Sequence, residues 1–143
     1  AAIIDRFAGL DRAAGEELLA ECETLGGCAT GQAKITPAYN LPCDYVIHTV
    51  GPIVRGELTR QHCELLKSCY RSCLELAEQN GVESIAFCCI STGAFHFPNQ
   101  RAAEIAVETV RKFKAETGSK MKVIFNVFKD LDLEIYRRLL TEG

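Results

Sequence analysis

Three short apolar runs, separated by long helical patterns, constrain the fold of this chain more than any other feature. The runs occupy residues 44–50, 83–90 and 121–127, and their length and their β-branched and aromatic side chains are typical of buried strands. The intervals are long enough for crossover helices, which predicts parallel strands with helices on the faces of the sheet. Residues 33–36 are the first strand candidate along the chain.

Helical periodicity fills the intervals between these runs. Residues 11–24, 57–80 and 100–116 place apolar side chains at spacings of three or four, which predicts amphipathic helices. Asn99 is a candidate cap for the third of them, and Asp130 is predicted to cap a last helix.

Charge and composition exclude several classes of protein. The 143 residues carry a net charge of −3, which argues against a basic nucleic-acid clamp or a polybasic membrane binder. No apolar run approaches the roughly 18 residues of a membrane span, and the first residues lack the basic start and apolar stretch of a signal peptide. We therefore expect neither nucleic acid nor membrane as a partner. The sequence does not indicate an oligomeric state.

The chain contains eight cysteines in no metal-binding pattern. No CxxC pair occurs, and Cys88 and Cys89 are adjacent within an apolar run, which suits neither a zinc ribbon nor a zinc finger. The simplest interpretation is that they are reduced thiols used as small core residues, which predicts a cytoplasmic location.

Ligands of parallel sheets bind beyond the carboxyl ends of the strands. That rule selects Gly51-Pro52, residues 91–98 and residues 126–128. In the second segment, hydroxyl side chains and Gly93 at a strand end would let backbone N–H groups approach phosphate oxygens, near the N-terminus of a helix. The alternative is an ordinary turn whose aromatic residues, Phe95 and Phe97, cover the core.

Other residues carry weaker signals. Phe128 would stack on a base at a strand end or belong to the core. His48, inside an apolar strand, is predicted to be a satisfied core histidine, and His62 to be solvated on its helix. His96 is left open between loop packing and function. No Cys-His pair has a spacing that indicates a nucleophile and its base.

Several segments together resemble the macrodomain family. The resemblance is carried by residues 12–22, 30–36 and 45–52, and by Ile90-Ser91-Thr92-Gly93 with Phe95 and Phe97-Pro98. The sequence of residues 31–43 and 125–130 is similar to that of the microbial zinc-containing branch of protein-ADP-ribose hydrolases.

The resemblance implies a three-layer α/β/α fold with a mostly parallel, mixed sheet. It also implies that residues 1–143 are one domain, N-terminally incomplete because the family's N-terminal strands and catalytic or metal loop have no counterpart here. Its implied ligand is ADP-ribose, free or attached to protein. The residues implied to hold the diphosphate and distal ribose through backbone N–H groups are Ser91, Thr92, Gly93, Ala94 and Phe95. Asn126 and Phe128 are implied to flank the adenosine end.

The resemblance to the macrodomain family leaves the activity open. No catalytic residue and no metal ligand is assigned, and zinc is expected only in a longer form. The resemblance favours hydrolysis of ADP-ribosyl groups from modified proteins or from a related acyl-ADP-ribose. The alternatives are a non-catalytic ADP-ribose-binding module and a structural or interaction domain of macrodomain shape.

Overall fold

A mixed sheet with helices packed against it confirms the predicted α/β class. The computed structural model describes residues 2–5, 29–37, 44–92, 95–127 and 129–141. In these residues five strands form one sheet in the order β2-β3-β1-β4-β5. The strands are β1 (Ala2–Asp5), β2 (Ala33–Pro37), β3 (Tyr45–Thr49), β4 (Ser84–Phe87) and β5 (Lys122–Phe125). The helices are α3 (Arg60–Gln79), α4 (Asn99–Thr117) and α5 (Asp130–Thr141).

Strand β1 is the main correction to the sequence analysis, which placed no strand before residue 33. It lies in the middle of the sheet, where Ile3 pairs with Val46 of β3 and with Ala86 of β4. A run of four residues is too short to carry a periodic signal, so its strand state depends on the neighbours on both sides.

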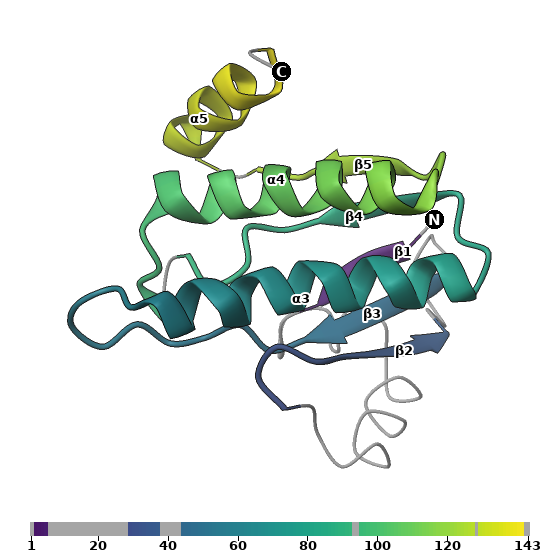
Figure 1. Cartoon of the computed structure of the whole chain (residues 1–143), viewed down its shortest axis with the longest axis horizontal. Coiled ribbons are helices and arrows are strands. Elements are labelled where there is room, and N and C mark those ends of the chain that lie inside the picture. Colours follow the sequence, from purple (N-terminus) through teal and green to yellow (C-terminus); the bar gives the residue numbers. More distant parts are fainter. Residues whose placement is uncertain (1, 6–28, 38–43, 93–94, 128, 142–143) are drawn as a thin grey trace.

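Strand direction agrees with the predicted crossovers. β1, β3, β4 and β5 are parallel, and β2 runs antiparallel to β3. In Figure 1 the arrows of β3 and β5 therefore point the same way and that of β2 points the opposite way. The carboxyl ends of the four parallel strands thus meet at one edge of the sheet.

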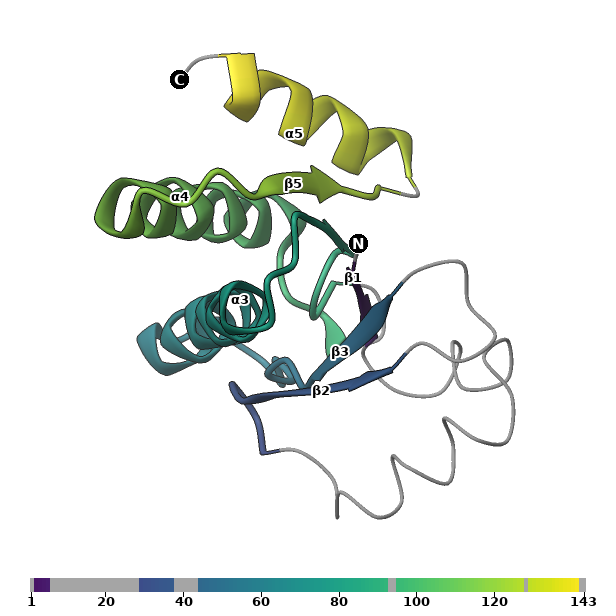
Figure 2. The ribbon, with the colours of Figure 1, turned by 90° about the vertical axis from the view of Figure 1, so that its right-hand side faces the viewer.

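Helices α3 and α4 lie side by side on one face of the sheet, and α5 lies beyond β5 (Figure 2). The apolar faces predicted for α3 and α4 are buried, including Leu66, Cys69 and Phe113. The helix predicted over residues 11–24 lies outside the described residues, and so does any third layer it would form.

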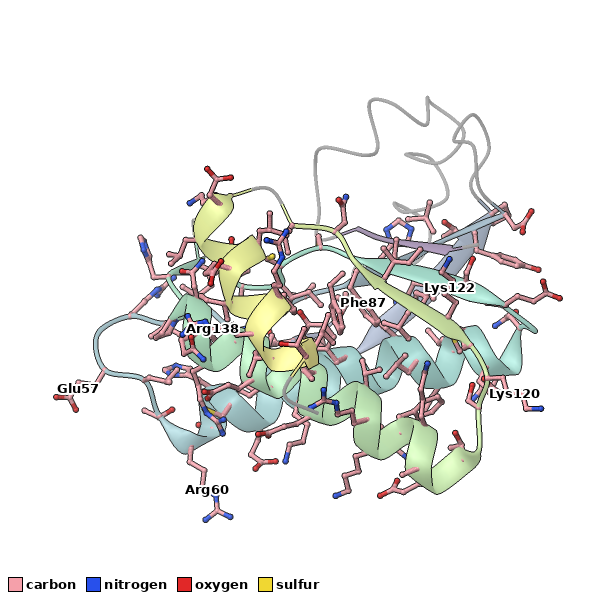
Figure 3. The ribbon with its side chains drawn as sticks, turned by 90° about the horizontal axis from the view of Figure 1, so that it is seen from above. Glu57, Arg60, Phe87, Lys120, Lys122 and Arg138 are labelled. Carbon is pink, nitrogen blue, oxygen red and sulfur yellow. The ribbon has the colours of Figure 1, made fainter. Side chains whose placement is uncertain are left out.

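Aromatic rings fill the core between the sheet and the helices. The ring centroid of Phe87 lies 4.9 Å from that of Tyr70 and 6.2 Å from that of Phe125, and Phe125 lies 4.9 Å from Tyr136. Figure 3 shows Phe87 inside the molecule and Glu57 at its periphery. Burial raises the pKa of Tyr70 and of Tyr136, because a phenolate would lose its hydration there.

Two strands are shorter than predicted. The runs at 83–90 and 121–127 form strands only over Ser84–Phe87 and Lys122–Phe125. Apolar side chains continue beyond the last paired residue, since Ile90 is 1% exposed although it lies in a turn. Burial, which produced the sequence signal, therefore extends further than strand pairing.

Two predictions about the helix starts are also corrected. Pro98, and not Asn99, precedes α4, and the Asn99 amide instead donates a hydrogen bond of 2.6 Å to Asp132 of α5. Asp130 is the first residue of α5, where its charge suits the helix dipole. Thr59 is the N-cap of α3, and His62, predicted to be solvated, is partly exposed and completes the capping box: its Nδ1 accepts from the Thr59 N–H while the Thr59 hydroxyl accepts from the His62 N–H.

Candidate functional site

The carboxyl edge of the parallel strands is the site that both topology and sequence select. β3 is followed by the buried residues Gly51 and Pro52, β4 by residues 88–92, and β5 by Asn126. The predicted segments at 51–52 and 91–98 therefore start at the same edge of the sheet, on either side of β1, although about forty residues separate them in sequence.

The loop that joins β4 to α4 has a strained backbone. Ser91 and His96 adopt φ values of 65° and 61°, in the left-handed region that side chains usually avoid. The Phe97 N–H donates to the Ser91 carbonyl at 2.9 Å, and the Thr92 hydroxyl donates to the Cys89 carbonyl at 3.2 Å. These two hydrogen bonds hold the described residues of the loop at each of its ends.

Burial separates the side chains of this loop into two groups. Ser91 is 1% exposed, and its hydroxyl has no hydrogen-bond partner among the described residues. Phe97 is buried in the main core, so for this residue the core alternative is confirmed. Phe95 is half-buried and His96 is exposed. A ligand would therefore meet Phe95 and His96 before it met Ser91 or Phe97.

The loop after β3 supports the loop after β4. The Val54 N–H donates to the Phe95 carbonyl at 2.9 Å. Gly51 lies so close to Ser91 that a Cβ added at Gly51 would be 1.9 Å from the Ser91 hydroxyl oxygen. The sequence singled out Gly51 as part of a strand-end segment, but nothing local in it indicates this distant contact.

The remaining predicted residues have mixed outcomes. Asn126 lies at the end of β5, where its backbone N–H donates to the Phe87 carbonyl at 2.7 Å and its side chain is exposed. Gly93, Ala94 and Phe128 lie outside the described residues. The core reading of His48 is confirmed, because the ring is buried and its Nε2 lies 3.0 Å from the Thr36 hydroxyl.

No metal centre is assigned among the described residues. They contain no group of three or more His, Cys, Asp or Glu side chains that could hold a metal ion. Cys22, Cys28 and Cys43 lie outside them, so the expectation about zinc is untested. The described cysteines, at positions 63, 69, 73, 88 and 89, are reduced and take part in no disulfide. Within the same residues, no helix combines the length and the apolar character that a membrane span requires.

A charged hollow of about 590 Å³ lies between α3 and α4, away from the strand ends. Its central cation, Arg71, is paired at 2.8 Å with Glu75 and at 2.8 Å with Glu116. The Arg71 guanidinium also lies 5.1 Å from the centre of the Phe113 ring. These contacts join the two helices and already occupy the Arg71 cation. We therefore assign no ligand to the hollow.

Comparison with known proteins identifies relatives of this chain in sequence and in fold. A family model described as the Macro domain matches residues 8–106. The chain is 62% identical over 112 residues to a protein-ADP-ribose hydrolase of Treponema medium. It is 54% identical over 134 residues to the ADP-ribose glycohydrolase MACROD2 of Xenopus laevis. A crystal structure of the Trypanosoma brucei macrodomain in complex with ADP-ribose matches with a TM-score of 0.87 and 38% identity.

These matches cover the chain more fully than they cover the relatives. The chain is matched over 78% of its length by the Treponema protein and spans 43% of that protein. The corresponding shares for the Xenopus protein are 93% and 32%, and for the Trypanosoma structure 97% and 62%. The similarity therefore concerns one region of longer proteins.

Proposed function

The chain belongs to the macro domain family, and from this premise we propose that it binds ADP-ribose and hydrolyses ADP-ribosyl groups from modified proteins. The names of the Treponema and Xenopus relatives, both ADP-ribose hydrolases, support the reaction class. The similar Trypanosoma structure, which holds ADP-ribose, supports the ligand.

The observation that carries the proposal is the loop at the carboxyl edge of the sheet, whose backbone is strained and held by hydrogen bonds. Non-glycine residues with left-handed backbone persist only where the surroundings enforce them, and such strain concentrates at ligand sites. Here Ser91 and His96 both adopt that conformation, and the carbonyls of Ser91 and Phe95 each accept a backbone hydrogen bond that holds the described part of the loop. A loop held in advance loses little entropy when it closes on a ligand.

We assign the diphosphate and distal ribose to residues 91–95 and the adenosine end to Asn126 and Phe128. The buried Ser91 hydroxyl supports a backbone role for Ser91, because a side chain that is 1% exposed has little access to a ligand. Backbone N–H groups in a tight turn form a concave anion site that needs no cationic side chain. This agrees with the composition of residues 91–98, which contain no Lys or Arg.

Hydrolysis would add water across the bond between the distal ribose and the protein. The products are free ADP-ribose and the unmodified side chain, so the reaction needs no redox partner. The loop would contribute by holding the diphosphate, and with it the ribose, in one orientation relative to the attacking water. The group that positions or activates that water is unassigned.

Binding without catalysis is the second candidate function. It is favoured by the composition of residues 91–98, whose only ionisable side chain is that of His96. A loop without a carboxylate can grip a diphosphate, but it offers few groups for proton transfer.

Two measurements test these functions in turn. Calorimetric titration with ADP-ribose should give saturable binding, tighter than that of AMP or ribose-5-phosphate, because only ADP-ribose spans the whole site. Single-turnover incubation with an ADP-ribosylated protein should then release ADP-ribose. Binding without release would favour the second function. No binding of ADP-ribose at millimolar concentration would refute both.

We also propose a cytoplasmic location and no nucleic-acid or membrane partner. The reduced cysteines in the described residues and the net charge of −3 support this. Cell fractionation followed by thiol labelling tests it, and recovery of the protein in an oxidising compartment would contradict it.

A further inference from the structure

We infer that Gly51 is a positioning residue: the contact it permits with Ser91 holds the loop after β4 in its ligand-binding shape. The inference rests on the proposed ADP-ribose binding, and it gives the loop after β3 a role in that binding. Gly51 need not touch the ligand, because it acts through the segment it supports.

The contact between the two loops leaves no space for a side chain at position 51. A Cβ placed on Gly51 would lie 1.9 Å from the Ser91 hydroxyl oxygen, 2.7 Å from Cγ2 of Ile90 and 3.2 Å from Cβ of Ser91. Ile90 and Ser91 are each 1% exposed, so other atoms surround both side chains. A methyl group here must push the side chains of Ile90 and Ser91 aside. Because both are enclosed in a densely packed interior, we expect the segment that carries them to shift as well.

A second contact joins the same two loops further along. The Val54 N–H donates to the Phe95 carbonyl at 2.9 Å, and Val54 is itself buried. The loop after β3 therefore holds the next loop at Ser91 by packing and at Phe95 by a hydrogen bond. These two residues are the first and last of those proposed to grip the diphosphate.

The supporting loop is in turn anchored to the body of the protein. The Val50 carbonyl accepts from the Gly31 N–H at 2.9 Å and from the Cys69 thiol of α3 at 3.2 Å. The Gly31 carbonyl accepts from the hydroxyls of Ser68 and Ser72 at 2.7 and 3.1 Å. Because position 51 follows this anchor directly, a methyl group at Gly51 would move Ser91 and not the backbone of Gly51.

Ser91 offers a way to reverse that displacement. Its hydroxyl has no hydrogen-bond partner among the described residues, and its φ of 65° is one that glycine adopts without steric cost. Replacement by glycine removes two of the three contacts that a Cβ at position 51 would meet and keeps the backbone N–H. A second substitution should therefore compensate for the first.

The test compares the wild-type protein with Gly51→Ala, Ser91→Gly and the double variant, by calorimetric titration with ADP-ribose and with AMP. We expect Gly51→Ala to weaken ADP-ribose binding by about tenfold or more, since a small misplacement of a positioned group is enough for such a loss. AMP lacks the diphosphate and the distal ribose, so its affinity should change much less. The double variant should bind ADP-ribose more tightly than Gly51→Ala, because of the three contacts only the one with Ile90 remains.

A control and a stability measurement distinguish positioning from unfolding. Ile53→Ala, at an exposed position of the same loop, should leave both affinities unchanged. Thermal unfolding of each variant reports whether it is folded. If Gly51→Ala does not fold, recovery of both folding and ADP-ribose affinity in the double variant supports the inference.

Two results would overturn it. Either Gly51→Ala binds ADP-ribose as the wild type does, or the double variant binds no better than Gly51→Ala alone. A wild-type protein that binds no ADP-ribose gives a different pattern: it removes the proposed function, and this inference with it.

Discussion

Two residues of the loop after β4 adopt a backbone conformation that favours glycine. Ser91 and His96 have φ values of 65° and 61°. Their positions differ, since Ser91 is buried and His96 is exposed. The cost of the left-handed conformation can therefore be measured at His96 with little disturbance of packing.

We predict that His96→Gly stabilises the fold by about 0.5–1 kcal/mol. The gain is the left-handed cost of a side chain, about 1–2 kcal/mol, less the larger entropy of glycine in the unfolded chain. Denaturant unfolding measures the difference. His96→Ala is the matched control, because it removes the imidazole and keeps the Cβ. Equal stability of the two variants would show that the imidazole, and not the backbone, sets the effect.

At the residue scale, the sequence located the candidate site but did not predict its shape. Ser91, Thr92 and Phe95 were selected because they follow a strand. The left-handed backbone was not predicted, because its residues are not glycines. The contact between Gly51 and Ser91 depends on how two distant loops fold together, and single-sequence patterns carry only local information.

At the element scale, α3 and α5 each contribute a buried tyrosine to the core. Tyr70 of α3 packs against Phe87 of β4, and Tyr136 of α5 packs against Phe125 of β5, each pair with tilted rings. Burial is the main cause that raises the pKa of both phenols. The packing of these helices is therefore coupled to pH in the alkaline range.

We predict that the free energy of unfolding falls as the pH rises above about 10, the ordinary pKa of tyrosine. In that range the unfolded chain releases phenolic protons that the folded chain still holds, so ionisation favours unfolding. Tyr136→Phe should make this fall less steep, while at about pH 8 its stability should lie within about 1–2 kcal/mol of the wild type. Urea unfolding at about pH 8 and at a pH above about 10 measures the effect. An equally steep fall in wild type, Tyr136→Phe and Tyr70→Phe would contradict it.

Helices and three strands were predictable because their signals are periodic or dense. The burial predicted for β5 is wrong, because it lies at an edge of the described sheet with its residues exposed or half-buried. The runs at 44–50, 83–90 and 121–127 each contain a strand, and 57–80 and 100–116 each contain a helix. Exact ends were not predictable, since apolar burial continues past the last paired residue. β1 was missed because its pairing with β3 and β4 exists only in the assembled sheet.

At the scale of the whole molecule, Phe87 connects the sheet with the core. It is fully buried, its ring lies near those of Tyr70 and Phe125, and its carbonyl accepts from Asn126 at the candidate site.

We predict that Phe87→Ala lowers the free energy of unfolding by about 3–5 kcal/mol, the usual cost of removing a buried ring. That is a large part of the roughly 5–15 kcal/mol that holds a domain folded. Denaturant unfolding measures it. Ile124→Ala is the control, since Ile124 on β5 is 44% exposed and its loss should cost much less. Similar losses for the two variants would show that burial does not decide the cost.

The interlocking of Gly51 with Ser91 has a consequence for chimeric proteins. A chimera that took residues 88–98 from a homologue but kept its own residues 50–54 would pair two loops that do not pack together. Residues 50–54 and 88–98 should therefore be exchanged together if the recipient is to acquire the donor's selectivity.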